Sequence, residues 1–535
     1  MPTFKLDGQA IPFEPGDTII RAAHRQGVEI PHYCWHPGLS APANCRMCLV
    51  EILPKAGTRP MMLDVLEFDS KANEYRPVQK PKLQPACYIG ASDGMEVLSD
   101  TSENVKRARH DVQEFLLLNH QVDCPICDQA GECKLQDYWL DYQKTGKRMR
   151  DEPVHKPKAV EFGPTIVYDA ERCVMCTRCV RFMDEVAKDP VLDMRQRGNL
   201  NEIFVSPGRA LDGHYTFMTE HVCPVGALTT KDFRFKARVW FLRSAEAVCQ
   251  GCATGCNAHL DFDPRDNKAH RYRPRDNEKV NKYWMCDEGM LTYRAAHDGR
   301  VTEPRSRGSS GAAATSSASA LDAVKKLFDG VAKESVAIVL SAQHSLEDNW
   351  ALRELGTVLM GTKNVYRSGQ AEGYEDTILI HRDKNPNTRG VDLLAGGAKP
   401  LKALVDDVVA SRVTHIIALG GAAATDVSPL SSAKVVTVAA HDGPLVEAAS
   451  VVLPATSWAE QTGTFVNAKG LAQVSDQALE PQGSSKPAWL QLNAIAKVLG
   501  YEASWTKVKQ IRAQLAPPAQ PATASSTAPT QATAE

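Results

Sequence analysis

The chain has 535 residues, which is enough for several domains because a single hydrophobic core stops growing well short of that length. Its 62 Lys and Arg residues nearly balance 64 Asp and Glu residues, so charge gives no reason to expect nucleic acid or an anionic membrane as a partner. Mean hydropathy is −0.31, and no apolar run reaches the roughly 18 residues of a transmembrane helix.

The N-terminal segment MPTFKLDGQAIPF is typical of a folded element and lacks the regions of a signal peptide, so we expect a protein that is soluble where it is made. Residues 1–14 predict a hairpin that turns at Asp7-Gly8. A helix capped by Asp17 or Thr18 should follow and end at Gly27.

The sequence MCLVEIL (47–53) predicts a strand, and the polar, Pro- and Lys-rich residues 54–82 predict a surface insertion. Residues 103–119 predict a helix. Its expected apolar face carries Val105, Val112, Phe115, Leu116 and Leu118.

Beyond residue 320 the pattern changes to alternating strands and helices, which indicates a parallel α/β domain. Helices are expected at 346–359 and 399–410. The small, polar residues 305–320 have the composition of a linker, and the tail from Pro517 lacks the apolar content to fold. The predicted strands are 335–340, 414–419, 434–439 and 450–454.

All 15 cysteines lie between Cys34 and Cys286, and none occurs in the last 249 residues. An odd number in a chain without a secretion signal argues against a disulfide framework, so we interpret them as metal ligands. They fall into four groups.

The first group combines a C-x2-C pair with two distant cysteines, which is similar to plant-type 2Fe–2S ferredoxins although the first gap is ten residues and not four. A zinc knuckle is the alternative. The group consists of Cys34, Cys45, Cys48 and Cys87.

The third group has the C-x2-C-x2-C spacing and remote Cys-Pro of bacterial 4Fe–4S ferredoxins, and zinc is a weak alternative. The fourth group favours 4Fe–4S as well, but its spacing discriminates less well against zinc. The third group is Cys173, Cys176, Cys179 and Cys223, and the fourth is Cys249, Cys252, Cys256 and Cys286.

The second group, Cys124, Cys127 and Cys133, is one ligand short of four. An external ligand, an open iron position or His120 could complete it. Imidazole ligates iron in Rieske centres, and the incomplete neighbouring site favours His120.

These motifs together resemble the large iron–sulfur subunit, the G subunit, of bacterial NADH–quinone oxidoreductase, respiratory complex I. The resemblance is carried by IPHYCWHPGLSAPANCRMCLVE, PACYIGASDGMEV, EFLLLNHQVDCPICDQAGECKLQD, RCVMCTRCVRF and HVCPVGALT, and it runs continuously over residues 1–240. It implies a 2Fe–2S cluster on the first group, a 4Fe–4S cluster on His120 and the second group, and another on the third.

The fourth group resembles an extra 4Fe–4S site that only some members of this family keep. From about residue 320 the likeness extends to molybdopterin oxidoreductases, most clearly in ASVVLPATSWAEQTGTFVNAKGLAQ (449–473). The domain is short, no cysteine follows Cys286, and Asp287-Glu288 stand where active enzymes have basic residues. We therefore expect no molybdopterin and a structural role for this domain.

The resulting fold class is multidomain α+β and α/β, with a β-grasp ferredoxin-like domain at the N-terminus and a truncated molybdopterin-oxidoreductase-like α/β domain at the C-terminus. The expected parts are the 2Fe–2S domain at 1–99, a 4Fe–4S domain with one histidine and three cysteine ligands at 100–150, the ferredoxin-like 4Fe–4S domain at 151–240, the fourth cluster domain at 245–300, a linker at 301–320, the α/β domain at 321–515 and a disordered tail at 516–535.

The resemblance also implies function. The chain should relay electrons from an NADH- and FMN-binding subunit, among other peripheral-arm subunits, towards quinone. It should lie in the cytoplasm, peripheral to the inner membrane. No nucleotide fingerprint stands out, and GGAAA at 420–424 is a weak phosphate-loop candidate. The alternatives are an electron-transfer subunit of an NAD-linked hydrogenase or formate dehydrogenase, and a zinc-stapled assembly scaffold.

Overall fold

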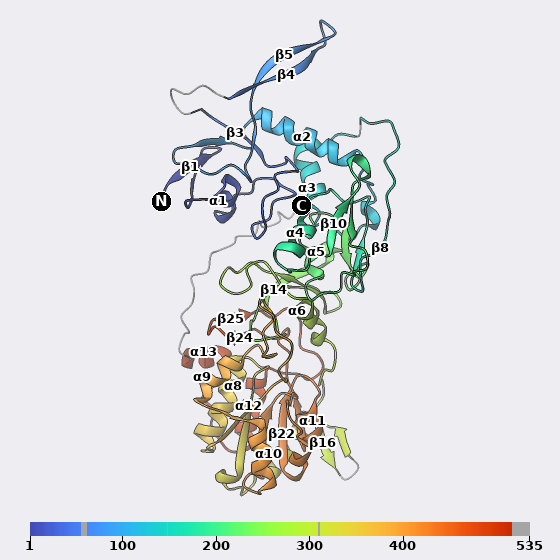
Figure 1. Cartoon of the computed structure of the whole chain (residues 1–535). Helices are drawn as coiled ribbons and strands as arrows, with labels where there is room; N and C mark the ends of the chain where they lie inside the picture. Colours follow the sequence, from blue (N-terminus) through green and yellow to red (C-terminus); the bar gives the residue numbers. More distant parts are fainter. Residues whose placement is uncertain (55–60, 147, 309–310, 516–535) are drawn as a thin grey trace. The chain divides into compact units, whose positions relative to one another are not determined.

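The computed structural model describes residues 1–54, 61–146, 148–308 and 311–515. The chain divides into two compact units, one from Met1 to Val239 and one that begins at Trp240 (Figure 1). Each unit has its own sheets. None of the described helices is both long and apolar enough to cross a bilayer.

The first unit opens with a five-stranded sheet in the order β2-β1-β7-β3-β6. The predicted hairpin turns at Asp7-Gly8, where both residues have positive φ, and the predicted helix is capped by the Thr18 side chain. Phe4, Val50 and Val97 are buried in the core under the helix. The elements are β1 (Thr3–Leu6), β2 (Gln9–Pro12), α1 (Ile19–Arg25), β3 (Leu49–Ile52), β6 (Gln84–Pro85) and β7 (Glu96–Leu98).

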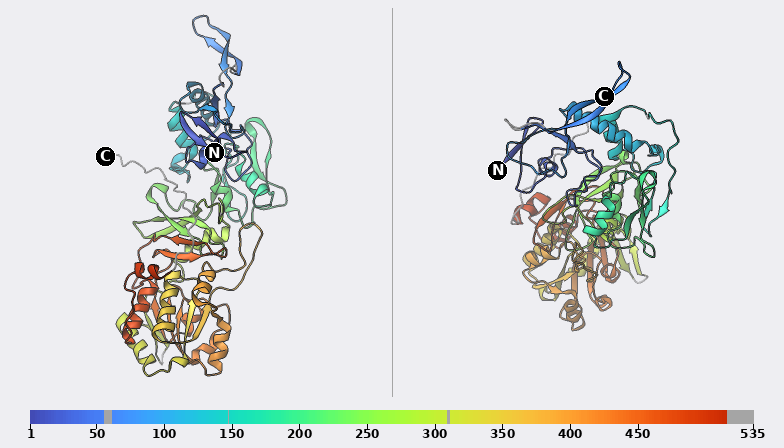
Figure 2. Two further views of the ribbon diagram at one scale, coloured as in Figure 1. Left: turned by 90° about the vertical axis from the view of Figure 1, so that its left-hand side faces the viewer. Right: turned by 45° about the horizontal axis from the view of Figure 1, so that its top comes forward.

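The described part of the predicted insertion is a two-stranded hairpin, β4 (Met62–Asp69) and β5 (Glu74–Pro81). It extends away from the five-stranded sheet in the views of Figures 1 and 2. Leu66 and Tyr75 are 69% and 67% exposed. The insertion therefore lies on the surface of the unit, as predicted, but with regular strand pairing.

The predicted helix over 103–119 is present as α2 (Glu103–Leu117), but its expected apolar face is wrong in part. Phe115 is 73% exposed, whereas Arg109 and Gln113 are fully buried. Arg109 donates to Ser99 Oγ at 2.6 Å, and Gln113 accepts from the Tyr33 hydroxyl at 2.6 Å. Satisfied polar groups can thus replace apolar ones on a buried face.

The rest of the first unit consists of short helices and strands. Its strands form a three-stranded sheet, β12-β9-β8, and the pair β10-β11. The elements are η1 (Cys124–Ile126), α3 (Lys134–Tyr138), η2 (Trp139–Gln143), β8 (Val160–Glu161), β9 (Ile166–Tyr168), α4 (Arg178–Glu185), β10 (Leu192–Arg195), η3 (Gly198–Leu200), β11 (Glu202–Val205), α5 (Phe217–His221) and β12 (Leu228–Thr230).

The second unit begins with an antiparallel sheet, β13-β14-β15, that packs on a later hairpin, β24-β25. Asn257 on β14 and Gln473 on β25 hydrogen-bond through their side chains. The elements are η4 (Val239–Phe241), β13 (Arg243–Val248), β14 (Asn257–Asp263), β15 (Lys268–Pro274), α6 (Asp287–Leu291), η5 (Thr292–Ala296), β24 (Gly463–Val466) and β25 (Ala472–Ser475).

An eight-stranded sheet in the order β17-β16-β23-β22-β21-β18-β19-β20 is the main layer of this unit. The four predicted strands are its parallel centre, with fully buried residues such as Ile338, Ile417 and Val436. Helices cover it, and both predicted helical stretches are present, one of them continuing as a π-helix.

The remaining elements are α7 (Ser317–Phe328), η6 (Lys333–Ser335), β18 (Val336–Ser341), α8 (Leu346–Arg353), η7 (Glu354–Leu359), β19 (Asn364–Ser368), α9 (Thr388–Ala395), β20 (Lys399–Pro400), α10 (Leu401–Val409), β21 (His415–Leu419), η8 (Ser428–Ser432), β22 (Lys434–Ala439), α11 (Pro444–Ala448), β23 (Val451–Pro454), α12 (Ala488–Val498) and α13 (Val508–Gln514).

The expectation of a linker at 301–320 is wrong. Within it, β16 (Arg305–Gly308) and β17 (Gly311–Ala314) form a hairpin, and β16 extends the large sheet by pairing with β23. Ser316 then caps α7. Backbone pairing and one cap stabilise this segment, so its low apolar content does not prevent it from folding. The tail from Pro517 lies outside the described residues.

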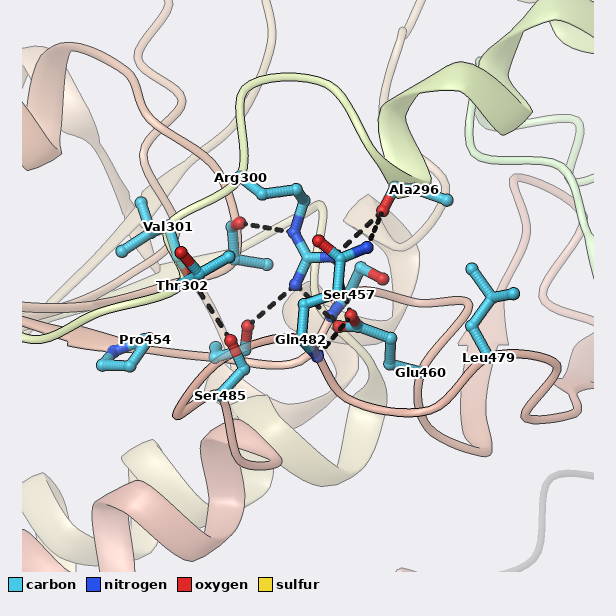
Figure 3. A network of polar contacts seen from close by, with 12 residues as sticks. Ala296, Arg300, Val301, Thr302, Pro454, Ser457, Glu460, Leu479, Gln482 and Ser485 are labelled. Atoms are coloured by element: carbon cyan, nitrogen blue, oxygen red, sulfur yellow. Dashed lines mark hydrogen bonds and ion pairs between the residues drawn. The ribbon is translucent and has the colours of Figure 1, made fainter. Parts of the chain in front are cut away.

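A buried arginine joins several segments of the second unit (Figure 3). Arg300 pairs with Glu460, and the side chains of the pair are 3% and 0% exposed. Arg300 also donates to the carbonyl oxygens of Ala440 and Ala296 at 2.9 and 3.0 Å. The Arg300 side chain thus joins the segment before β16 to the loop after β23.

Candidate metal sites

All 15 cysteines are free thiols, and each is buried or half-buried. In the first group Cys34 and Cys45 hydrogen-bond through their thiols, as do Cys48 and Cys87. The Cys34 thiol lowers the pKa of Cys45 to about 6. Cys45 and Cys48 also interact electrostatically, so the two pairs belong to one site. Cys48 directly precedes β3 in the sequence.

The second group is built around the η1 turn, in which the Cys127 amide donates to the Cys124 carbonyl at 3.2 Å. Cys133 lies immediately before α3 and interacts electrostatically with both. Burial raises the pKa of Cys133 to about 12. His120 is half-buried in the segment that joins α2 to this turn, and its role as a ligand stays a prediction.

The third group lines a small cavity, with Tyr168 as a further wall residue. Burial raises the pKa of Cys173, Cys176 and Cys223 to about 11. The Cys179 pKa is well above its ordinary value for the same reason. The four thiols therefore line a buried site in which a thiolate without a nearby positive charge is unfavourable.

The fourth group lines a second cavity at the start of α6. The Gly251 and Gly289 amides donate to the sulfurs of Cys249 and Cys286 at 3.4 and 3.3 Å. A methyl group on Gly289 would lie 3.0 Å from one of these sulfurs and 3.2 Å from the other. Backbone amides that point at sulfur stabilise a thiolate.

Two glycines lie directly against cysteine sulfurs. A methyl group at Gly226 would lie only 2.3 Å from the Cys127 sulfur, so the loop of the third group approaches the second group too closely for a side chain. Sequence reasoning noted the glycines of CQGCATGC but missed Gly226 and Gly289. The only available signal was their position just after a cysteine, in CPVG and CDEG.

The donor sets fit iron–sulfur clusters on chemical grounds. Buried thiolates are costly without a nearby positive charge, and iron in a cluster supplies that charge while thiolate sulfur supplies the ligands. Zinc would satisfy the same sulfurs. Comparison with known proteins favours iron–sulfur binding for three of the groups.

Family models match four stretches of the chain. They are described as the 2Fe-2S iron-sulfur cluster binding domain (residues 1–102), the NADH-ubiquinone oxidoreductase-G iron-sulfur binding region (109–148), the NADH-quinone oxidoreductase subunit 3 ferredoxin-like domain (163–229) and molybdopterin oxidoreductase (266–498). The first three contain the first, second and third cysteine groups. They confirm the expected fold class of iron–sulfur domains followed by a molybdopterin-oxidoreductase-like domain.

Curated relatives agree with the models. The G subunit of the NADH-quinone oxidoreductase of Streptomyces coelicolor is 31% identical over 68% of this chain and 40% of its own length. The mitochondrial NADH dehydrogenase [ubiquinone] iron-sulfur protein 1 of Solanum tuberosum is 34% identical over 68% of this chain and 45% of its own length. A chain of a solved NAD+-reducing [NiFe]-hydrogenase is 26% identical, with a TM-score of 0.36 over 44% of this chain and 91% of that one.

The chain is therefore homologous to the G subunit of NADH-quinone oxidoreductase over 68% of its length, as the sequence motifs predicted. It spans less than half the length of these curated relatives.

Proposed function

We propose that this chain is an electron-transfer subunit of an NADH:quinone oxidoreductase. The observation that carries the proposal is that three of the four converging thiol sets lie within matches to iron–sulfur domains of this family. Iron–sulfur clusters, when bound, exchange single electrons. The protein fixes their spacing, burial and hydrogen bonds, and so their potentials.

We propose one 2Fe–2S cluster and three 4Fe–4S clusters. The first group would hold the 2Fe–2S cluster, and His120 would complete the second group. The third and fourth groups would hold 4Fe–4S clusters through four thiolates each. Electrons would pass through the first three sites, and the fourth site would stabilise the second unit.

We propose that the second unit holds no molybdopterin. Ligands of open α/β sheets bind outside the carboxyl ends of the strands. Beyond the end of β18, polar side chains are hydrogen-bonded within the protein: Gln343 donates to Asn385 Oδ1 at 2.7 Å, and Asn349 to the Ser341 carbonyl at 2.9 Å. No cysteine follows Cys286 that could ligate molybdenum.

The partners would be an NADH- and FMN-binding subunit and other peripheral-arm subunits, on the cytoplasmic side of the inner membrane. One relative is named as a subunit of NADH-quinone oxidoreductase and another as an iron-sulfur protein of NADH dehydrogenase [ubiquinone], which supports this assignment.

The test is a metal and redox analysis of the full chain purified without oxygen. We expect about 14 iron and 14 sulfide per chain, visible absorption, and EPR signals from both cluster types after reduction. A colourless chain that holds zinc would overturn the proposal and support the assembly-scaffold alternative.

A further inference from the structure

Two arginines on helix α4 contact the backbone of both the first and the third cysteine group. Arg178 and Arg181 are three residues apart, so they lie on the same face of the helix. The helix starts just after Cys176 and contains Cys179.

Arg181 contacts one cysteine of each group with a single nitrogen. Its Nη2 donates to the Cys34 carbonyl at 2.5 Å and to the Cys176 carbonyl at 3.3 Å. Its Nη1 donates to the Ser40 carbonyl, and its Nε to Thr177 Oγ1 at 3.2 Å. Two cysteine residues from different groups thus lie within hydrogen-bonding distance of the same atom.

Arg178 repeats the arrangement one turn earlier. Its Nη2 donates to the Trp35 carbonyl, and its Nη1 to the Val222 carbonyl at 3.2 Å. Trp35 follows Cys34 in the sequence, and Val222 precedes Cys223. Each guanidinium therefore joins the backbone beside a cysteine of the first group to the backbone beside a cysteine of the third.

Within the part of the chain that the structure describes, neither arginine is neutralised by an ion pair. Their hydrogen-bond acceptors there are carbonyl and hydroxyl oxygens, and Arg178 is only 7% exposed. The nearby Glu185 carboxylate accepts from the Ser40 amide at 2.8 Å. Both guanidinium groups therefore lie between the two cysteine groups, and Arg181 also interacts electrostatically with the Glu185 carboxylate.

We propose that Arg178 and Arg181 are positioning residues that fix the first and third metal sites relative to each other and raise the reduction potential of both. The proposal rests on the proposed function. Reduction adds negative charge to a centre, so a nearby fixed cation favours the reduced form. The planar guanidinium suits this role because it donates in several fixed directions.

The principal test is the Arg181→Gln variant, compared with Arg181→Lys, in redox titrations followed by EPR. We expect both variants to bind the full complement of iron. Arg181→Gln should lower the midpoint potentials of the first and third centres, because it removes the charge. Arg181→Lys keeps the positive charge, so the midpoint potentials of both centres should change little. Electron transfer between the two centres should be slower, because one ammonium cannot reach all these acceptors.

The matched control is Arg209→Gln in the same unit. Arg209 pairs with Asp189 on the surface and donates to the Pro190 carbonyl at 3.4 Å, so its loss should leave both potentials unchanged. If Arg181→Gln does not bind its full complement of iron, the test is the rate of electron transfer between the two centres in Arg178→Lys and Arg181→Lys.

Unchanged potentials in a fully loaded Arg181→Gln protein, or an unchanged transfer rate in both lysine variants, would overturn the inference. The proposed function fails differently, because the unaltered chain would then lack EPR-active centres altogether.

Discussion

Arg300 and Glu460 form a doubly hydrogen-bonded ion pair that is almost completely shielded from water. Arg300 Nη2 lies 2.6 Å from Glu460 Oε2, and Nη1 lies 2.9 Å from Oε1. Glu460 also accepts from the amides of Ser457 and Gln482, at 2.7 and 3.0 Å (Figure 3). Every oxygen of this buried carboxylate is therefore used.

Replacing one member of this pair should destabilise the second unit strongly, because the other charge stays buried without a counterion. For Glu460→Gln we expect the free energy of unfolding to fall by about 3–5 kcal/mol. Denaturation followed by hydrogen exchange in β22 and β23 measures it. Asp442→Asn is the matched control: it breaks the exposed pair with Arg305 and should cost less than about 1 kcal/mol. Equal losses in the two variants would contradict this prediction.

The sequence predicted the elements that local residue patterns determine. The four central strands of the large sheet were recognisable because continuous runs such as THIIAL have to be buried on both faces. The cysteine groups were recognisable because cysteines separated by two residues can bring their sulfurs together within one tight turn.

Elements that depend on distant partners were missed. Composition could not reveal that β16 pairs with β23, because Arg305 and Ser306 face residues 452 and 451 far along the chain. The buried face of α2 was misjudged for a similar reason. Arg109 can be buried because acceptors such as Ser99 and Asp100 receive its guanidinium.

Gly226→Ala should selectively remove the cluster of the second group. The added methyl group would lie 2.3 Å from the Cys127 sulfur and 3.0 Å from Gln129 Cβ, so the loop or the ligand has to move. We expect a loss of about four iron per chain and of one 4Fe–4S EPR signal. The control is Gly146→Ala, where nothing lies within 4 Å of the new methyl group. Full iron content in Gly226→Ala would refute the close approach.

His120→Ala tests the proposed sixteenth ligand directly. If the imidazole ligates iron, the variant should lose the EPR signal of the second centre. His120→Cys should restore the iron but lower the midpoint potential, because imidazole ligation raises the potential relative to thiolate. His110→Ala, in the preceding helix α2, serves as the control. Unchanged cluster content and signals in His120→Ala would show that the histidine is not a ligand.

His344 should make the second unit sensitive to mild acid. It follows β18, and its Nδ1 lies 3.1 Å from Ser341 Oγ. Burial lowers the pKa of His344 to about 4, because the charged imidazolium loses its hydration there. In the unfolded chain the pKa returns to about 6.5, so between these two values the unfolded state binds more protons. His344 therefore costs the folded state nothing above about pH 6.5. The free energy of unfolding then falls as the pH decreases from 6.5 towards 4.

The expected loss over that interval is about 3 kcal/mol at most. His344→Gln has no titrating group, so the difference in the free energy of unfolding between the unaltered chain and this variant should change by that amount between pH 7 and pH 4. Subtracting the two curves cancels titrating groups that do not interact with His344, such as the neighbouring Asp348, whose pKa burial raises to about 6. His441 interacts electrostatically with His344 and is the exception. A difference that stays constant with pH would mean that His344 is solvated or charged in the folded protein, contrary to its close packing against Gly420.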